Sequence, residues 1–191
     1  MDKIYDLAKF LENTSYEEIP PKAIESAKTL FLDIIATITA GSTAPTCHEV
    51  ETLYADKGGK PESHILVYGD KVPASSAAFV NTLMAHSRDF DDTHEEAIIH
   101  TGVSVVSTAM AVAEQVGGVS GKLFLKSIVM AVDVFTRLAL ASELSVYESG
   151  WVFTSLFAYF ANAMSASLLR GHNAEQMVNS AGIVLSQAAG I

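Results

Sequence analysis

Residues 17–42 read EEIPPKAIESAKTLFLDIIATITAGS, and this stretch decides the expected fold class. Leu30, Ile34, Ile35 and Ile38 recur with the spacing of one face of an α-helix. A Pro-Pro pair at 20–21 stands where such a helix would begin, and a glycine at 41 stands where it would end. The stretch therefore predicts one long helix.

The same periodicity continues along most of the chain. Further helices are expected at 3–12, 46–57, 102–116, 121–142, 150–170 and 174–189. Another is expected from about Pro73 to the charged stretch that begins at residue 86. One short β segment is expected at 63–69, SHILVYG, because it is rich in β-forming residues and flanked by glycine and proline. We predict an all-α class, with residues 1–191 forming one multi-helix domain.

Composition narrows the classes of function. A chain of 191 residues suits one domain, and with 18% charged residues it can build a large core. The formal charge of −10, without a basic stripe, speaks against nucleic acid as a partner. The lone Cys47 excludes an internal disulfide, which makes a reducing cytoplasm the simplest compartment. The charged amphipathic amino terminus does not resemble a signal peptide.

Two apolar segments suggest covered surfaces. Residues 151–169, WVFTSLFAYFANAMSASLL, carry no charge and approach the length of a membrane span. Thr154, Ser155 and Asn162 dilute the segment, which favours a buried core or interface helix. After Arg170 only Glu175 is charged, so the chain ends as though more protein should follow. We expect no membrane association, and we expect self-association.

Titratable residues gather at 86–102, HSRDFDDTHEEAIIHTG, which holds five carboxylates, one arginine and three of the six histidines. A metal site is one interpretation, with candidate ligands at Asp89, Asp91, Asp92, His94, Glu95 and His100. Residues 91–95, DDTHE, fit the aspartate-rich pattern of magnesium-dependent isoprenoid synthases. That chemistry needs a second metal-binding motif, which contains an asparagine, on a facing helix. The two nearest asparagines, at 162 and 179, do not stand in such a motif.

A solvated loop and an acid–base site are the other two interpretations. Charge runs are usually solvated, but Phe90 is expected to anchor this loop to a core. His100 precedes a nearly charge-free helix and is expected at a buried helix amino terminus. A histidine beside a carboxylate can move a proton, which makes His100 a candidate acid–base residue and Asp89 the carboxylate expected to orient its ring. Thr93 could donate a hydrogen bond to substrate, and the neighbouring arginine at 88 could clamp a carboxylate.

Residues 77–102, AAFVNTLMAHSRDFDDTHEEAIIHTG, resemble the signature of the MmgE/PrpD family. The typical signature is A-x-x-N-[GA]-x-x-x-H-x-x-D-[FY]-D-D-T-H, followed after a short loop by H-P-[GS]. Residues 17–42 resemble the family's amino-terminal helix pair, and residues 157–190 resemble its later helices. The resemblance covers essentially the whole chain.

The resemblance implies a metal-free, cofactor-free lyase or isomerase that acts on small polycarboxylates. The family includes 2-methylcitrate dehydratases, cis-aconitate decarboxylases and iminodisuccinate epimerases, built from a helical domain plus a smaller α+β domain and usually dimeric. The implied catalytic residues are His100, Asp89 and Thr93, and the substrate-binding candidates are Arg88, His86 and Asp92. The expected partner is a second copy of the chain or a separately encoded carboxy-terminal half.

The chain departs from the family pattern in ways that predict weak activity. His100-Thr101-Gly102 lacks the proline of H-P-[GS], and Val152 stands where the family commonly has a second histidine. The family's length is more than twice that of this chain, so we expect a truncated form without the α+β domain and its cationic groups. A non-catalytic interaction or dimerisation remnant is the main alternative, and a magnesium-dependent isoprenoid synthase-like protein is a lesser one.

Overall fold

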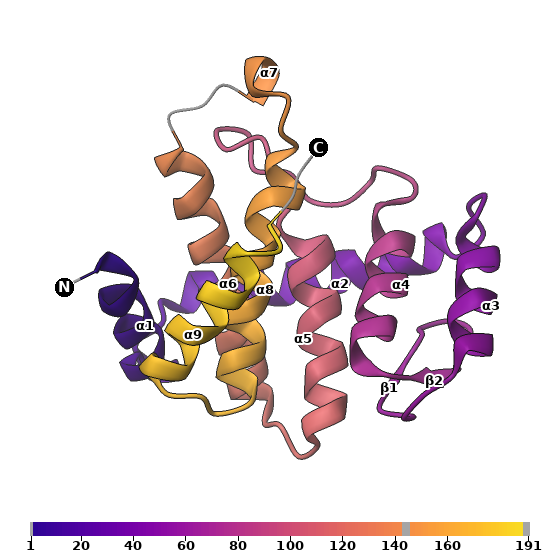
Figure 1. The fold of residues 1–191 in the computed structure, drawn as a ribbon, viewed down its shortest axis with the longest axis horizontal. Coiled ribbons are helices and arrows are strands. Elements are labelled where there is room, and N and C mark those ends of the chain that lie inside the picture. The colour runs from indigo at the N-terminus through magenta and orange to yellow at the C-terminus, as the bar shows by residue number, and fades with distance from the viewer. Residues whose placement is uncertain (1, 143–145, 189–191) are drawn as a thin grey trace.

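The computed structural model describes residues 2–142 and 146–188, which are mostly helical (Figure 1). The helices of these residues are α1 (Lys3–Asn13), α2 (Pro21–Gly41), α3 (Cys47–Lys57), α4 (Ala74–His86), α5 (Gly102–Val116), α6 (Gly121–Ala141), α7 (Val146–Ser149), α8 (Phe153–Leu169) and α9 (Ala174–Leu185), with a 3-10 turn η1 (Tyr16–Glu18). The predicted all-α class is confirmed. The predicted helix 174–189 ends four residues earlier, and residue 189 lies outside the described ranges.

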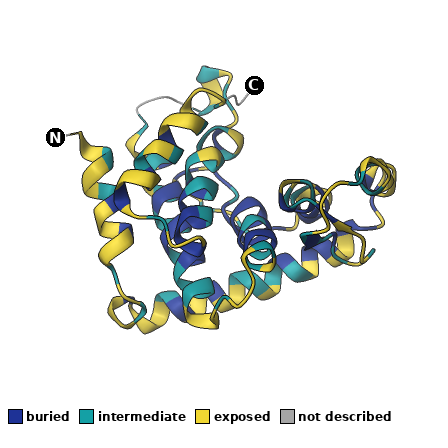
Figure 2. Ribbon diagram, turned by 60° about the horizontal axis from the view of Figure 1, so that its bottom comes forward, coloured by how far each residue is buried: buried dark blue, intermediate teal, exposed yellow. Residues whose placement is uncertain are grey.

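Helix α5 is the centre of the fold. It packs against α4, α8 and α6, while α2 crosses the bundle and contacts α4, α5 and α6 (Figure 1). Small side chains let neighbouring helices approach α5 closely, and Val105, Val106 and Ala109 are completely buried. A second core joins α1 and α9 to α6 and α8, and Figure 2 shows buried residues lining the inner faces of the helices.

One glycine sets the contact between α2 and α4. A Cβ atom added at Gly41 would lie 1.8 Å from the backbone oxygen of Met84, so only glycine fits there. Met84 is two residues before His86, the last residue of α4. The end of α2 therefore fixes the position of the helix end that carries His86.

The predicted strand at 63–69 is wrong beyond its first two residues. Strand β1 (Ser63–His64) pairs antiparallel with β2 (Lys71–Val72), and the intervening residues form a turn. The backbone N–H of Ile65 donates to the oxygen of Asp70 at 2.8 Å, and Val67 has a positive φ of 70°. The chain reverses at this point because it closes a hairpin, whereas composition alone suggested one extended segment.

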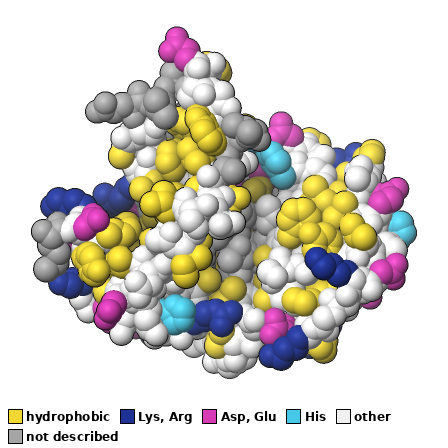
Figure 3. Space-filling view, viewed as in Figure 1, with side chains coloured by type: hydrophobic (Ala, Val, Ile, Leu, Met, Phe, Trp, Pro, Cys, Tyr) yellow, Lys and Arg dark blue, Asp and Glu magenta, His cyan; other side chains and the backbone are white. Residues whose placement is uncertain are grey.

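All but the first two residues of the uncharged stretch 151–169 form α8, which packs against α6, α5 and α9. Its buried residues include Phe153, Ala161 and Met164, as expected of a core helix. Among the helices in the described ranges, none is long and apolar enough to cross a membrane. Apolar side chains do gather on parts of the surface, notably over α4 (Figure 3), where Phe79 is 52% exposed.

Candidate acid–base site

The charged stretch is a connection between two packed helices. Helix α4 ends at His86 and α5 begins at Gly102, so both ends of the connection are held by the core. Within it, the backbone N–H of His94 donates to the oxygen of Ile99 at 2.8 Å, which closes a small loop. The backbone N–H of His100 donates to Thr154 Oγ1 of α8 at 3.1 Å. A residue 54 positions away therefore holds His100 in place.

Asp92 binds the amino terminus of α5. Its carboxylate accepts hydrogen bonds from the backbone N–H of Thr101 (3.1 Å), from Thr101 Oγ1 (2.6 Å) and from the backbone N–H of Gly102 (2.7 Å). These bonds satisfy amide groups that a helix leaves unpaired, and the negative charge suits this end of the helix dipole. A Cβ at Gly102 would lie 2.5 Å from Asp92 Oδ1, so the glycine is needed for this arrangement.

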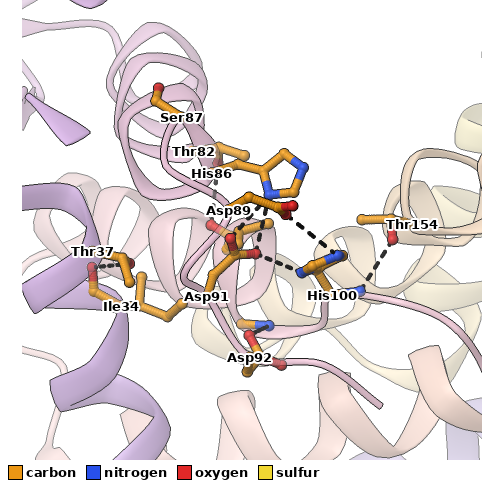
Figure 4. Close-up of polar contacts among 12 residues, drawn as sticks. Ile34, Thr37, Thr82, His86, Ser87, Asp89, Asp91, Asp92, His100 and Thr154 are labelled. Carbon is orange, nitrogen blue, oxygen red and sulfur yellow. Dashed lines mark hydrogen bonds and ion pairs between the residues drawn. The ribbon is translucent and has the colours of Figure 1, made fainter. Parts of the chain in front are cut away.

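Asp91 points the other way and lies between two imidazole rings (Figure 4). Its side chain is completely buried. Nδ1 of His86 donates to Oδ1 and Oδ2 of Asp91 at 3.0 and 3.1 Å. Nδ1 of His100 lies 2.9 Å from Asp91 Oδ2, an ion-pair distance without the alignment of a hydrogen bond. A carboxylate in this position fixes the orientation of an imidazole ring.

Asp89, predicted to orient His100, lies beside the other nitrogen of that ring. Its Oδ1 is 3.9 Å from His100 Nε2, and its side chain is 78% exposed. Its φ is +54°, a region that aspartate tolerates better than most residues. The carboxylate that contacts Nδ1 of His100 is that of Asp91, which was not among the residues predicted for the acid–base site. Sequence spacing gives no signal of which aspartate faces the ring.

A cavity of about 580 Å³ lies beside these rings. His86, Asp89, His100, Val152 and Thr154 line it, together with the helix residues around them. Among its described lining residues there is no lysine or arginine. The cavity therefore offers proton-transferring groups and hydroxyls, and an anionic molecule inside it would need positive charge from elsewhere.

Three predicted substrate or catalytic residues do not line this cavity. Asp92 is engaged at α5, and Arg88 is exposed with Nη2 3.4 Å from Thr43 Oγ1. Thr93 is exposed and lines a separate hollow of about 690 Å³ between α2 and residues 90–93. The structure thus brings His86, Asp89 and His100 together, and their predicted roles stay predictions.

Two other expectations about the loop have clear outcomes. His100 does lie at the buried amino terminus of α5, with its side chain 24% exposed. Phe90 is 72% exposed, so the prediction that it anchors the loop in the core is wrong. Two neighbouring carboxylates hold the loop instead, because their hydrogen-bond partners are fixed at the ends of helices.

Electrostatics are unfavourable on the α2 side of the loop. Burial, followed by the charges of Asp92 and Asp91, raises the pKa of Asp33 above its ordinary value. The hollow on this side is lined by four residues with carboxyl groups, Glu25, Asp33, Asp91 and Asp92, and also by Lys22 and Thr93.

Four residues of the site could together hold a metal ion. His86, Asp89, Asp91 and His100 each offer one ligand atom, and these atoms lie within 4.8 Å of one another. This set differs from the aspartate-rich motif considered for magnesium, because Asp92 is engaged by α5. Two imidazoles and two carboxylates are also ordinary partners of a proton-transfer site.

Comparison with known proteins gives a consistent result. The family model for the MmgE/PrpD N-terminal domain matches residues 5–191. A cis-aconitate decarboxylase from Aspergillus terreus is 25% identical over 191 residues, which cover 97% of this chain and 39% of that protein. The cis-aconitate decarboxylase-like protein oryM from Aspergillus oryzae is 24% identical and covered over 40% of its length. The chain thus spans well under half the length of these relatives.

Proposed function

Because the chain belongs to the MmgE/PrpD family, we propose that it supplies the acid–base part of a lyase or isomerase site for small polycarboxylates. The observation that carries the proposal is the buried Asp91 carboxylate 2.9 Å from Nδ1 of His100, beside a cavity large enough for such a molecule. The two relatives named above are called cis-aconitate decarboxylase or similar to it, and cis-aconitate is a polycarboxylate of this kind.

In the proposed reaction, His100 gives or takes a proton at a carbon next to a carboxylate. Asp91 holds Nδ1 of the ring, which leaves Nε2 for the substrate, and Thr154 fixes the backbone of His100. Asp89 lies beside Nε2, with its Oδ1 3.9 Å away, and lines the same cavity. Thr93 lines the separate hollow beside α2, so it would donate a hydrogen bond to the substrate only if the substrate or a movement of the loop bridged that hollow and the cavity beside His100.

Positive charge for the substrate would come from outside these residues: from a further part of the protein, from a second copy of the chain or from a separately encoded protein. The described cavity lining lacks lysine and arginine, and the net charge of −10 opposes an anion. Val152, in the same cavity, cannot transfer a proton. We therefore expect the 191-residue chain to turn over below about 1 s⁻¹, at the low end of ordinary enzymes.

The test is an assay of the purified chain with 2-methylcitrate, cis-aconitate and iminodisuccinate, followed for hours by NMR. We expect slow conversion of at least one compound, a loss of about 10²–10⁴-fold in His100→Gln, and no effect of EDTA. His64→Gln is the matched control, because His64 also contacts a carboxylate, Glu114 at 2.8 Å, away from the cavity. Equal rates for His100→Gln and wild type would contradict the assignment. Val152→His tests whether a second histidine at that position raises the rate.

An interaction module is the second candidate function. The apolar side chains exposed on α4 and α9, with Phe79 at 52% and Ile183 at 68%, favour contact with another chain. Under this alternative, none of the three compounds is converted or bound. Sedimentation at micromolar concentration would still show a dimer, and Phe79→Ser would weaken it; a stable wild-type monomer would contradict self-association.

A further inference from the structure

The second imidazole of the site, His86, also faces Asp91 through its Nδ1. Nδ1 of both rings contacts the single buried carboxylate of Asp91, so each ring directs Nε2 away from it (Figure 4). Both residues line the cavity, and their ring centroids are 4.9 Å apart. His86 is the more accessible, with its side chain 48% exposed against 24% for His100.

We propose that His86 is a second catalytic acid–base group and works as a pair with His100, an inference that rests on the proposed function. Nδ1 of both rings lies on one buried carboxylate, and both residues line one cavity with their ring centroids 4.9 Å apart. The pair can therefore present one base and one acid to the same substrate. The pair fits reactions that both remove and deliver a proton, such as loss of water from a hydroxy-polycarboxylate.

For loss of water, the unprotonated ring takes a proton from the carbon next to a carboxylate through Nε2. The electron pair of the broken C–H bond forms the C=C bond while the C–O bond to the hydroxyl group breaks. The protonated ring gives its proton to the departing oxygen, which leaves as water. The two rings have then exchanged protonation states, and solvent restores them.

The contacts argue against a purely structural role for His86. A structural histidine in a core is enclosed, whereas His86 is half exposed and lines a cavity. Asp91 remains in contact with His100 if His86 is removed, so the loop keeps one of its two imidazole contacts and its Asp92 anchor. His86→Ala should therefore fold and leave room for a free imidazole.

The experiment compares wild type, His86→Ala and His64→Ala with 2-methylcitrate, with and without added imidazole, by NMR and by calorimetric binding. We expect His86→Ala to lose about 10²–10⁴-fold in rate, with affinity within about threefold and a cooperative unfolding transition at a lower temperature, because the buried Asp91 loses its hydrogen bonds from His86. Imidazole should restore rate in a saturable manner, and thiazole, which is far less basic, should not. His64→Ala should behave as wild type.

Each result decides between the two proposals. A rate for His86→Ala within fivefold of wild type, or a loss that imidazole does not restore, overturns the pair and leaves His100 as the proposed acid–base residue. A wild-type chain that neither binds nor converts the three polycarboxylates named above overturns the proposed function, and the pair with it.

Discussion

Replacing Asp92 by alanine should destabilise the whole domain. The change removes the acceptor of three hydrogen bonds and leaves the amides of Thr101 and Gly102, both in buried residues, without that partner. Loss of a helix cap costs about 1 kcal/mol, and an unpaired buried amide costs about 1–3 kcal/mol. Because the bonds share one carboxylate, the effects do not add fully, and we expect a loss of roughly 3 kcal/mol in the free energy of unfolding.

Urea unfolding followed by circular dichroism measures this loss, and thermal unfolding should shift by roughly 6–12 °C for a chain of this size. Glu95→Ala is the matched control, since it removes an exposed carboxylate from the same loop. Asp92→Asn keeps one acceptor oxygen and should lie between the two. If Asp92→Ala costs no more than Glu95→Ala, the carboxylate does not hold α5, and the account of the loop is wrong.

Three further changes test other parts of the structure. Gly102→Ala should cost about 2 kcal/mol or more in urea unfolding, because its Cβ would lie 2.5 Å from Asp92 Oδ1; a neutral effect would contradict that packing. Asp33→Asn should stabilise the protein at pH 7. The pKa of the Asp33 carboxyl is raised in the folded state, so folding takes up protons between about pH 3.8 and that raised pKa. The free energy of unfolding of the wild type therefore falls as the pH rises through this range, and the asparagine variant avoids that loss. The difference between Asp33→Asn and wild type should shrink as the pH falls towards 3.8, and a constant difference would refute the cause. Glu51→Gln should likewise stabilise at pH 7, since burial and then Asp70 raise the pKa of this 4% exposed carboxyl; destabilisation at pH 7 but not at low pH would show that the charged form is needed.

The helices could be predicted from the sequence because their causes are local. Periodic apolar residues, the Pro-Pro pair at its start and the glycine at its end predicted α2 within about one residue, and the glycine that follows Val116 predicted the end of α5. The hairpin could not be predicted in the same way, because a turn at Ile65–Asp70 depends on pairing between two-residue strands.

The candidate site could be predicted in part. Its location followed from the gathering of histidines and carboxylates, and the position of His100 followed from the helix it precedes. The sequence does not indicate that Asp91 contacts the imidazole rings while Asp92 binds the start of α5. The two residues are chemically identical, and only the surrounding helices distinguish them. The prediction that Phe90 anchors the loop failed for a related reason. An aromatic residue within a polar run is expected to be buried, but the side chain of Phe90 faces solvent.

The adjacency of Asp91 and Asp92 links the opening of the site to the fraying of a helix. Consecutive Cα atoms are about 3.8 Å apart, so the loop cannot release the imidazole pair by a large movement while Asp92 still binds α5. The amides of Thr101 and Gly102, both bonded to Asp92, then exchange with solvent deuterium only when the loop lifts away. Their exchange rates would therefore report how often the site opens, in the unliganded protein and without any substrate or assay of turnover.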